Sequence, residues 1–230
     1  MLSYIAGFCD GDGSICIGKC NSGYQLKLEF TQCNKKFLEL LNSYFDNIGK
    51  IYKDNRENKY TNECAHQLRF CGHNSTELLL IMKKYGIVKA EQASLALKFL
   101  ELINKHNKTE EKEQLCLKMK ELNKDKSSYI KSYDNISDAY IAGLFDAEGN
   151  VYIKEEPKFK HYIQITQKCD PVLISNIKAY LSYGNTYKSE PFRLRFYSKL
   201  DTNNFYNIVK DYSLIKIEKL EYLVNLVNKK

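Results

Sequence analysis

The chain has 230 residues, 43% of them hydrophobic, which is enough for one large domain or two small ones with a sizeable core. Its 35 Lys and Arg against 28 Asp and Glu give a net charge of +7, which is compatible with a polyanionic partner. No stretch reaches the roughly 18 apolar residues of a membrane helix, so we expect no membrane partner.

The first predicted element is a short helix that recurs in the second half of the chain. Its sequence is Ile-Ala-Gly-Phe-Cys-Asp-Gly-Asp-Gly at Ile5–Gly13, and the second copy is Ile-Ala-Gly-Leu-Phe-Asp-Ala-Glu-Gly at Ile141–Gly149. Ser3 and Ser137 stand where N-caps belong, and each closing Gly is expected to end its helix in the left-handed conformation. The Ala-Gly pair in each copy predicts that the two helices pack closely.

Both copies place two acids one residue apart, Asp10 with Asp12 and Asp146 with Glu148. The C-terminus of a helix carries about half a negative charge, so acids there need a compensating cation. Hard carboxylate oxygens suit Mg²⁺. A single Asp-x-Asp-Gly is as easily a turn, but two copies in matching contexts favour a metal site.

Alternation and helical spacing predict the same elements after each copy. In the first repeat these are a hairpin of Ser14–Cys20 and Tyr24–Gln32 around the turn Asn21-Ser22-Gly23, the helix Phe37–Phe45, a hairpin of Ile48–Lys53 and His66–Cys71, and the helices Ser75–Tyr85 and Ala90–Ile103. In the second they are a hairpin of Gly149–Lys154 and His161–Gln167, the helix Val172–Leu181, a hairpin of Tyr187–Ser189 and Phe192–Tyr197, and the helices Thr202–Tyr212 and Ile217–Val227.

Further landmarks align the two halves. Thr31-Gln32 matches Thr166-Gln167, Gly49-x-x-Tyr52 matches Gly184-x-x-Tyr187, and residues 85–89 match 212–216. The first two matches lie 135 residues apart, whereas the last lies 127 apart. The second repeat therefore lacks about eight residues, which are most simply missing from the loop that corresponds to Arg56–Cys64. The polar stretch between the halves predicts a linker with a short helix around Leu115, Met119 and Leu122. We therefore expect an N-terminal repeat over 1–104, a linker over 105–136 and a C-terminal repeat over 137–230.

The two nonapeptides resemble the LAGLIDADG motif of homing endonucleases, and the order of elements is that of the same family. The resemblance covers nearly the whole chain apart from the linker. It implies an α+β fold of two pseudo-symmetric αββαββαα repeats, each with a four-stranded antiparallel, saddle-like sheet, packed through the two motif helices. Two motifs in one chain imply a pseudo-twofold monomer with no obligate protein partner.

One face of each predicted sheet is polar and free, and the other needs helices as cover. Gln and Asn suit adenine edges, Arg and Lys suit guanine, and two-stranded ribbons fit the major groove. An ordinary solvated face alternates in the same way, but the motifs and the many Gln, Arg and Tyr side chains favour DNA. The expected DNA-binding residues are Gln25, Lys27, Glu29, Gln67 and Arg69, with Asn150, Tyr152, Lys154, Lys160, Tyr162, Gln164, Arg193, Arg195 and Tyr197.

The resemblance implies a site-specific endonuclease that hydrolyses both strands of a long, non-palindromic duplex. It implies Mg²⁺ as the cofactor, or Mn²⁺, with Ca²⁺ supporting binding without cleavage. Asp10 and Asp146 are expected to be structural. The implied site residues are the metal ligands Asp12 and Glu148 with the backbone carbonyls of Gly11 and Ala147, the water-ordering Gln32 and Gln167, and the basic Lys89 and Lys216 near the scissile phosphates.

A second class of function stays open, namely a maturase of its host intron RNA or a DNA-binding protein of the same fold that does not cut. Intact acids in both motifs favour an enzyme, because binding needs neither. Glu148 replaces the family's more familiar Asp, which puts equal cutting of the two strands in question. An enzyme acting on small phosphates would need a Gly-rich phosphate loop, which the sequence lacks.

The eight cysteines show no C-x-x-C pair, so reduced thiols are expected. Cys64, His66, Cys71 and His73 have the side chains of a zinc site. Because His66 and Cys71 belong to an alternating strand, these groups would be scattered over two faces, and we expect no zinc there.

The composition also bears on the compartment. The N-terminus reaches Asp10 with no basic segment before its apolar run, so we expect no signal peptide. A transit-peptide pattern is also missing, which predicts a protein made in place or a chain without its presequence. Trp is absent whereas Lys, Asn, Ile and Tyr are plentiful, a bias typical of AT-rich organelle genomes. We therefore expect an intron-encoded protein of a mitochondrion or chloroplast, or otherwise an intracellular one.

Overall fold

The chain folds into two units, one of Asp12–Ile130 and one of Met1–Gly11 with Lys131–Lys230. The structure is a computed structural model that describes residues 1–21, 23–54, 64–105, 107–125, 130, 132–168 and 170–229. Each unit contains one four-stranded antiparallel sheet. Among the described residues, no helix is long and apolar enough to span a membrane. The domain boundaries expected from the sequence stay a prediction.

The sheet of the Asp12–Ile130 unit has the strand order β1-β2-β4-β3. Alternation places the apolar residues of β2, Leu26, Leu28 and Phe30, in the core, and leaves Lys27 and Glu29 between them partly exposed. The hydrophobic side chains are thus removed from water on one face only. The strands are β1 Gly13–Cys20, β2 Gly23–Gln32, β3 Lys50–Lys53 and β4 His66–Cys71.

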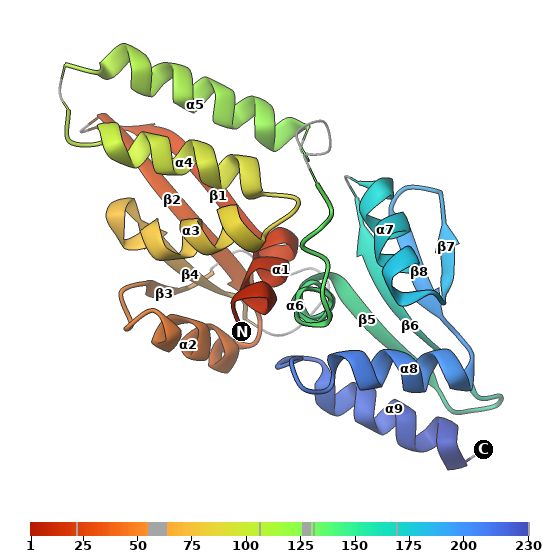
Figure 1. Cartoon of the computed structure of the whole chain (residues 1–230). Helices are drawn as coiled ribbons and strands as arrows, with labels where there is room; N and C mark the ends of the chain where they lie inside the picture. Colours follow the sequence, from red (N-terminus) through yellow and green to blue (C-terminus); the bar gives the residue numbers. More distant parts are fainter. Residues whose placement is uncertain are drawn as a thin grey trace. The chain divides into compact units, whose positions relative to one another are not determined.

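Helices cover the apolar face of this sheet (Figure 1). They are α2 Lys35–Tyr44, the 3₁₀ turn η1 Gly72–Ser75, α3 Thr76–Tyr85 and α4 Ala90–Leu102. Helix α2 begins where the side chain of Asn34 accepts a 3.0 Å hydrogen bond from the backbone N–H of Phe37, which satisfies one of the free N–H groups of the first turn.

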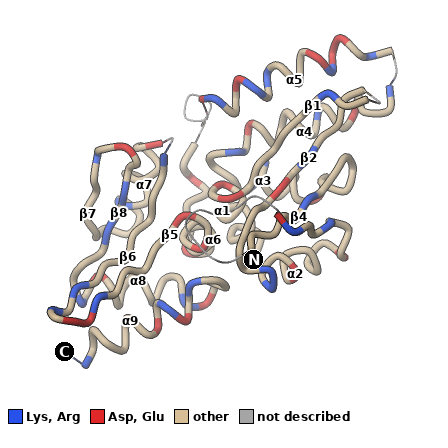
Figure 2. The backbone as a smooth tube through the Cα atoms, turned by 180° about the vertical axis from the view of Figure 1, so that it is seen from behind, with Lys and Arg blue, Asp and Glu red and all other residues tan. Residues whose placement is uncertain are grey.

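The segment between the repeats contains a 16-residue helix, α5 Thr109–Lys124. Lys and Glu alternate along it in Figure 2, whereas Cys116, Met119 and Leu122 are buried. The Cys116 thiol and the Asn123 amide each donate a 3.0 Å hydrogen bond to β1, to the carbonyls of Ile17 and Ile15. Strand β1 is an edge strand, so α5 covers carbonyl groups that would otherwise be open to pairing.

The second unit repeats the arrangement with the strand order β5-β6-β8-β7. Aromatic rings fill its core, where Phe205 stacks on Phe196 at 4.7 Å between ring centroids and meets Phe145 edge-on at 5.0 Å. Its elements are α1 Leu2–Asp12 as far as Gly11, α6 Asp138–Glu148, β5 Gly149–Lys154, β6 Lys160–Gln167, α7 Pro171–Leu181, β7 Asn185–Tyr187, β8 Phe192–Phe196, α8 Lys199–Val209 and α9 Ile217–Lys229. The predicted α+β class and the αββαββαα order are confirmed for both repeats.

Local details differ from the expectation. Helix α1 begins at Leu2, so Ser3 is not its N-cap, whereas Ser137 caps α6 by accepting from the Tyr140 N–H at 3.3 Å. Gly149 is extended, at φ −84° and ψ 160°, because the chain enters β5 directly.

Position 149 requires glycine for a steric reason. A Cβ on Gly149 would lie 2.3 Å from the carbonyl oxygen of Phe145. Gly13 starts β1 and is likewise outside the left-handed region, so the predicted left-handed ends are wrong for both helices. Strand β7 also ends at Tyr187, two residues earlier than predicted. Ser22 of the first turn, and residues 55–63 of the loop with the expected deletion, lie outside the described residues.

Candidate functional site

Helices α1 and α6 come closest at their motif glycines. A Cβ added to Gly7 would lie 2.1 Å from the carbonyl oxygen of Tyr140, and one added to Gly143 would lie 2.0 Å from that of Tyr4. Both contacts are with backbone atoms, which cannot move aside as a flexible side chain could. The backbones can therefore approach this closely only because no side chain stands between them, which confirms the predicted close packing.

The inner acids of the two motifs are joined to tyrosines of the opposite helix. The Tyr4 hydroxyl donates to Asp146 and the Tyr140 hydroxyl donates to Asp10, each at 2.8 Å and each fully buried. Burial, followed by the nearby carboxyl charge, raises the pKa of both tyrosines well above 10. The tyrosines therefore stay neutral and keep donating, so the two helices are locked by a reciprocal pair of hydrogen bonds.

Asp146 also accepts hydrogen bonds from residues 213–216, the segment that leads into α9. Its carboxyl group accepts from the Ser213 hydroxyl at 2.7 Å and from the backbone N–H groups of Leu214, Ile215 and Lys216 at 2.6, 3.1 and 3.1 Å. Since unpaired buried N–H groups are costly, these bonds fix the backbone of the segment that carries Lys216.

The side chain of Lys216 lies on the C-terminal end of α6. Its Nζ donates to the carbonyl oxygens of Phe145 at 2.9 Å and Ala147 at 3.4 Å, and also to that of Asp146. A cation here balances the negative end of the helix dipole. Part of the compensating charge expected from the sequence is therefore supplied by the chain itself, and Lys216 is brought next to Ala147, another predicted site residue.

Two more predicted site residues meet at the same helix end. A Cβ on Gly11 would lie 2.3 Å from the Cβ of Ala147 and 3.1 Å from the Cγ of Glu148, so the backbone of α1 runs directly against both. Gln167, in the same unit, is buried, and its Oε1 accepts from the Lys168 N–H at 3.0 Å.

The remaining predicted site residues lie in the Asp12–Ile130 unit. The Gln32 amide donates a short hydrogen bond to the carboxylate of Asp12, so these two are brought together. Lys89 precedes α4 at its N-cap position and is only 3% exposed. The catalytic roles of all these residues stay predictions.

The donor set at the motif ends fits a hard divalent cation. It consists of carboxylate oxygens and backbone carbonyls, which are the ligands that Mg²⁺ prefers. The Gln32 amide donates to one oxygen of the Asp12 carboxylate. No cluster of three His, Cys, Asp or Glu side chains that could hold a metal lies within the described ranges.

The polar faces of both sheets carry the predicted DNA-binding residues. Strand register pairs Glu29 with Arg69 in the first sheet and Gln164 with Arg195 in the second, so each pair shares one face. Tyr152 stacks on Tyr162 at 4.8 Å. By register and alternation the same faces carry Gln25, Lys27 and Gln67 in the first sheet, and Asn150, Lys154, Lys160, Arg193 and Tyr197 in the second. Contact with DNA stays a prediction for all of them.

Sequence reasoning missed two tyrosines on these faces. Tyr52 and Tyr187 served only to align the repeats, yet each lies on an outer strand, β3 or β7, with an arginine over its ring. Their equal spacing from Gly49 and Gly184, on strands that alternate, was the available signal.

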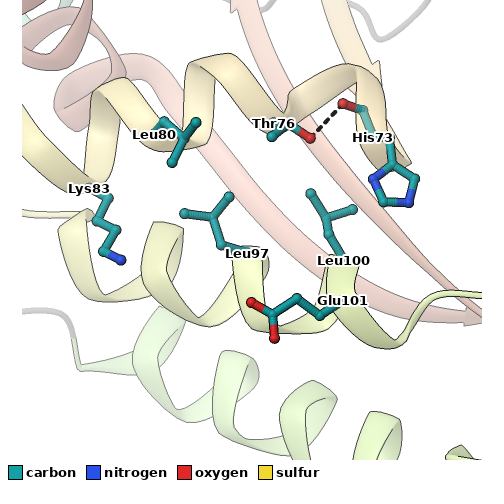
Figure 3. Close-up of a pocket in the computed structure, with 7 residues that line it drawn as sticks. All are labelled: His73, Thr76, Leu80, Lys83, Leu97, Leu100 and Glu101. Carbon is teal, nitrogen blue, oxygen red and sulfur yellow. Dashed lines mark hydrogen bonds between the residues drawn. The ribbon is translucent and has the colours of Figure 1, made fainter.

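A hollow of about 360 Å³ lies between helices α3 and α4 (Figure 3). It is on the helical side of the first sheet and contains none of the predicted site residues. The residues that line it are His73, Thr76, Leu80, Lys83, Leu97, Leu100 and Glu101.

The chain is similar to known proteins in sequence and in fold. Residues 5–94 match the family model described as LAGLIDADG endonuclease. The structure is similar to that of I-SmaMI bound to an uncleaved DNA target in the presence of calcium ions, with 19% identity and a TM-score of 0.79 over 100% of this chain and 92% of that one. No curated protein matched the chain.

Two further structures show the same fold. The LAGLIDADG meganuclease I-AabMI, bound to uncleaved DNA, is 18% identical with a TM-score of 0.77 over 99% of this chain and 90% of that one. The LAGLIDADG homing endonuclease I-GzeII, in complex with its DNA target, is 14% identical with a TM-score of 0.76 over 99% and 90%. These matches confirm the resemblance predicted from the two motifs.

Proposed function

Because the chain has the LAGLIDADG fold in both repeats and its first repeat matches the LAGLIDADG endonuclease family, we propose that it is a site-specific DNA endonuclease. It acts on a long, non-palindromic duplex and cuts both strands. The observation that carries this proposal is the duplicated acidic helix end, with Asp12 and Glu148 in matching motifs and a lysine fixed beside the second.

Recognition is proposed to use the polar faces of the two sheets. These faces carry Arg, Lys, Gln, Asn and Tyr on neighbouring strands, which suits the base edges of a major groove. The relatives I-SmaMI, I-AabMI and I-GzeII were each solved with DNA, which supports duplex DNA as the partner. The net charge of +7 favours association with the phosphate backbone.

Catalysis is proposed to depend on a divalent metal, Mg²⁺ or Mn²⁺. Asp12 and Glu148 would hold it through their carboxylates, with the backbone carbonyls of Gly11 and Ala147. When bound, the metal supplies charge stabilisation at the attacked phosphate and a more acidic water. I-SmaMI was solved in the presence of calcium ions, which supports a divalent site. In this chain we expect Ca²⁺ to allow binding without cleavage.

The protein side chains orient the reactants. Gln32, whose amide donates to the Asp12 carboxylate, is proposed to order a water with its remaining amide hydrogen. Gln167 is proposed to have the same role in the second repeat. Lys216 is held at the end of α6 and Lys89 at the start of α4, where each would stabilise negative charge on a phosphate or order the solvent.

The protein is proposed to act as a monomer, encoded in an intron of a mitochondrial or chloroplast genome. A maturase role on its host intron RNA, or DNA binding without cleavage, is the alternative. An endonuclease needs the motif acids for cleavage, whereas a maturase or a non-cleaving DNA-binding protein needs them for stability alone.

The deciding experiment is to select a target from a randomised duplex library and assay cleavage with Mg²⁺. We expect Asp12→Asn and Glu148→Gln to reduce double-strand cleavage at least a hundredfold and to retain DNA binding, because each removes one charged ligand. Asp134→Asn, an exposed acid outside the motifs, is the matched control. Full cleavage by either motif variant would contradict the metal-ligand assignment. Binding without cleavage by the wild type would favour the alternative.

A further inference from the structure

The two sheets carry an arginine at the same position of the same strand. Arg69 on β4 lies between Glu29 on β2 and Lys50 on β3. Arg195 on β8 lies in the same way between Gln164 on β6 and Asn185 on β7. Both arginines are flanked by inner and outer strands, and both are half-buried.

In the first sheet the guanidinium of Arg69 is ion-paired. Its Nε donates a short hydrogen bond to the carboxylate of Glu29, and both side chains are about one quarter exposed, at 28% and 27%. The ring of Tyr52 lies under the guanidinium at 4.9 Å from its centroid. One Nη2 hydrogen points to the Gln67 amide oxygen at 3.5 Å.

In the second sheet, the partners of the Arg195 guanidinium among the described residues are neutral. Its Nε donates to the Gln164 amide oxygen at 2.5 Å, and its Nη1 donates to the Tyr197 hydroxyl at 3.2 Å. The rings of Tyr162 and Tyr187 lie at 4.7 and 5.0 Å from it, one on each neighbouring strand. The hydroxyls of Tyr187 and Tyr197 are themselves hydrogen-bonded at 2.7 Å, which closes the cage.

Both arginines are therefore pre-oriented by a hydrogen bond from Nε and by at least one aromatic ring. In the described part of the chain, the hydrogen bonds to each guanidinium use Nε and one Nη, which leaves the rest of the Nη edge for a ligand. That edge matches O6 and N7 of guanine. A side chain already held by stacking and a hydrogen bond loses less entropy on binding than a mobile one.

The two guanidinium groups differ in the charge of the group that accepts from Nε. Glu29 neutralises Arg69, whereas the amide of Gln164 satisfies the same Nε without changing the charge of Arg195. A neutral pair attracts a polyanion less than an unpaired cation does, and it releases fewer counterions on binding.

We propose that Arg69 and Arg195 are equivalent guanine-reading positions, that Tyr52 and Tyr187 are their positioning residues, and that the exchange of Glu29 for Gln164 makes the second sheet the stronger reader. This inference rests on the proposed function, because its ligand is the duplex DNA target. It goes further by assigning unequal readout to the two half-sites and by naming the atoms responsible.

The test exchanges the two acceptors. Glu29→Gln gives the first position the neutral partner of the second, and Gln164→Glu does the reverse; both are nearly isosteric. With Ca²⁺ and the selected duplex, the slope of log K against log salt should steepen by about one for Glu29→Gln and flatten by about one for Gln164→Glu. Guanine preference should rise about tenfold at one base pair of one half-site, and fall about tenfold at one base pair of the other.

The controls make the same charge changes on exposed helical residues. Glu39→Gln on α2 matches the first variant and Gln114→Glu on α5 matches the second. Changes no larger than those of the controls, or spread evenly over the whole site, would overturn the inference while leaving the proposed function intact. A wild-type protein that binds no duplex would remove the proposed function and this inference together.

The positioning role has its own readout. Tyr187→Phe keeps the ring under Arg195, whereas Tyr187→Leu removes it. We expect the Leu variant to relax guanine preference at the same base pair as Arg195→Ala, and the Phe variant to keep most of it. Tyr180→Leu, an exposed tyrosine of α7 in the same unit, should leave the preference unchanged. Equal base profiles for Tyr187→Leu and the wild type would show that the ring is only structural.

Discussion

Asp146 shows how one buried side chain organises the neighbourhood of a candidate site. Its carboxyl group is fully buried, and it accepts from two hydroxyls, of Tyr4 and Ser213, and from three consecutive backbone N–H groups that end at Lys216. Each donor would be costly to bury without an acceptor. The free-energy cost of burying the Asp146 carboxyl group is thus offset by the hydrogen bonds that it accepts from these buried donors.

We therefore expect Asp146→Asn to lower the free energy of unfolding by about 2–3 kcal/mol, because an amide offers one acceptor oxygen and turns an NH₂ group toward N–H donors. Urea unfolding followed by circular dichroism measures this. Asp211→Asn changes an exposed acid just before Ser213 in sequence, and it should change stability by less than about 0.5 kcal/mol. Equal stability of the Asp146 variant and the wild type would contradict the importance of the network.

Much of this site follows from the sequence, and the part that does not has a physical cause. The repeated motif predicts the close helices and the acids at their ends. It does not predict that Asp146 binds residues 213–216, because these donors come from a segment about 70 residues away that folding alone brings near. Alternation places Leu28 inside and Glu29 outside, but it does not reveal that Glu29 is ion-paired to Arg69, since this depends on register between strands.

At the scale of elements, the backbones of α1 and α6 are in close contact at their glycines. Gly7 of α1 lies against the Tyr140 carbonyl of α6, and Gly143 of α6 lies against the Tyr4 carbonyl of α1. Neither position has room for a larger side chain. Interiors of proteins are packed as densely as organic crystals, so an extra methyl group here must push the helices apart.

Gly143→Ala tests this packing. The new Cβ would lie 2.0 Å from the Tyr4 carbonyl oxygen and 2.8 Å from the Phe8 nitrogen, and neither is a flexible side-chain atom. We expect a loss of at least about 2–3 kcal/mol in the free energy of unfolding. The matched control is Gly18→Ala in β1, where a Cβ would meet nothing within 4 Å and should be neutral or slightly stabilising. Similar unfolding curves for the two variants would contradict the steric argument.

At the scale of the whole molecule, the two units repeat one order of elements but differ in the chemistry of their sheets. The first sheet has a mixed set of acid, base and amide, with Glu29 paired to Arg69. The second has a cluster of tyrosines around Arg195, with Arg193 beside it on the same strand and no acid within that cage among the described contacts. Since one chain supplies both sheets, the halves are free to read different sequences.

This asymmetry predicts that neither half of the target is interchangeable with the other. Two palindromic duplexes, each built from one half-site and its inverted copy, should both bind more weakly than the selected site, because one sheet of the chain faces bases it does not match. Each mismatched base pair costs about 1–3 kcal/mol, so a loss of a hundredfold or more in affinity is expected for several mismatches.

Competition binding in the presence of Ca²⁺ measures this loss of affinity, and a duplex altered only outside the site is the control. The slope of log K against log salt should decrease less for the palindrome built from the half-site that Arg195 reads than for the other palindrome. Equal affinity for both palindromes and the selected site would mean that the two sheets recognise the same features, such as backbone shape, and that their different side chains do not read bases.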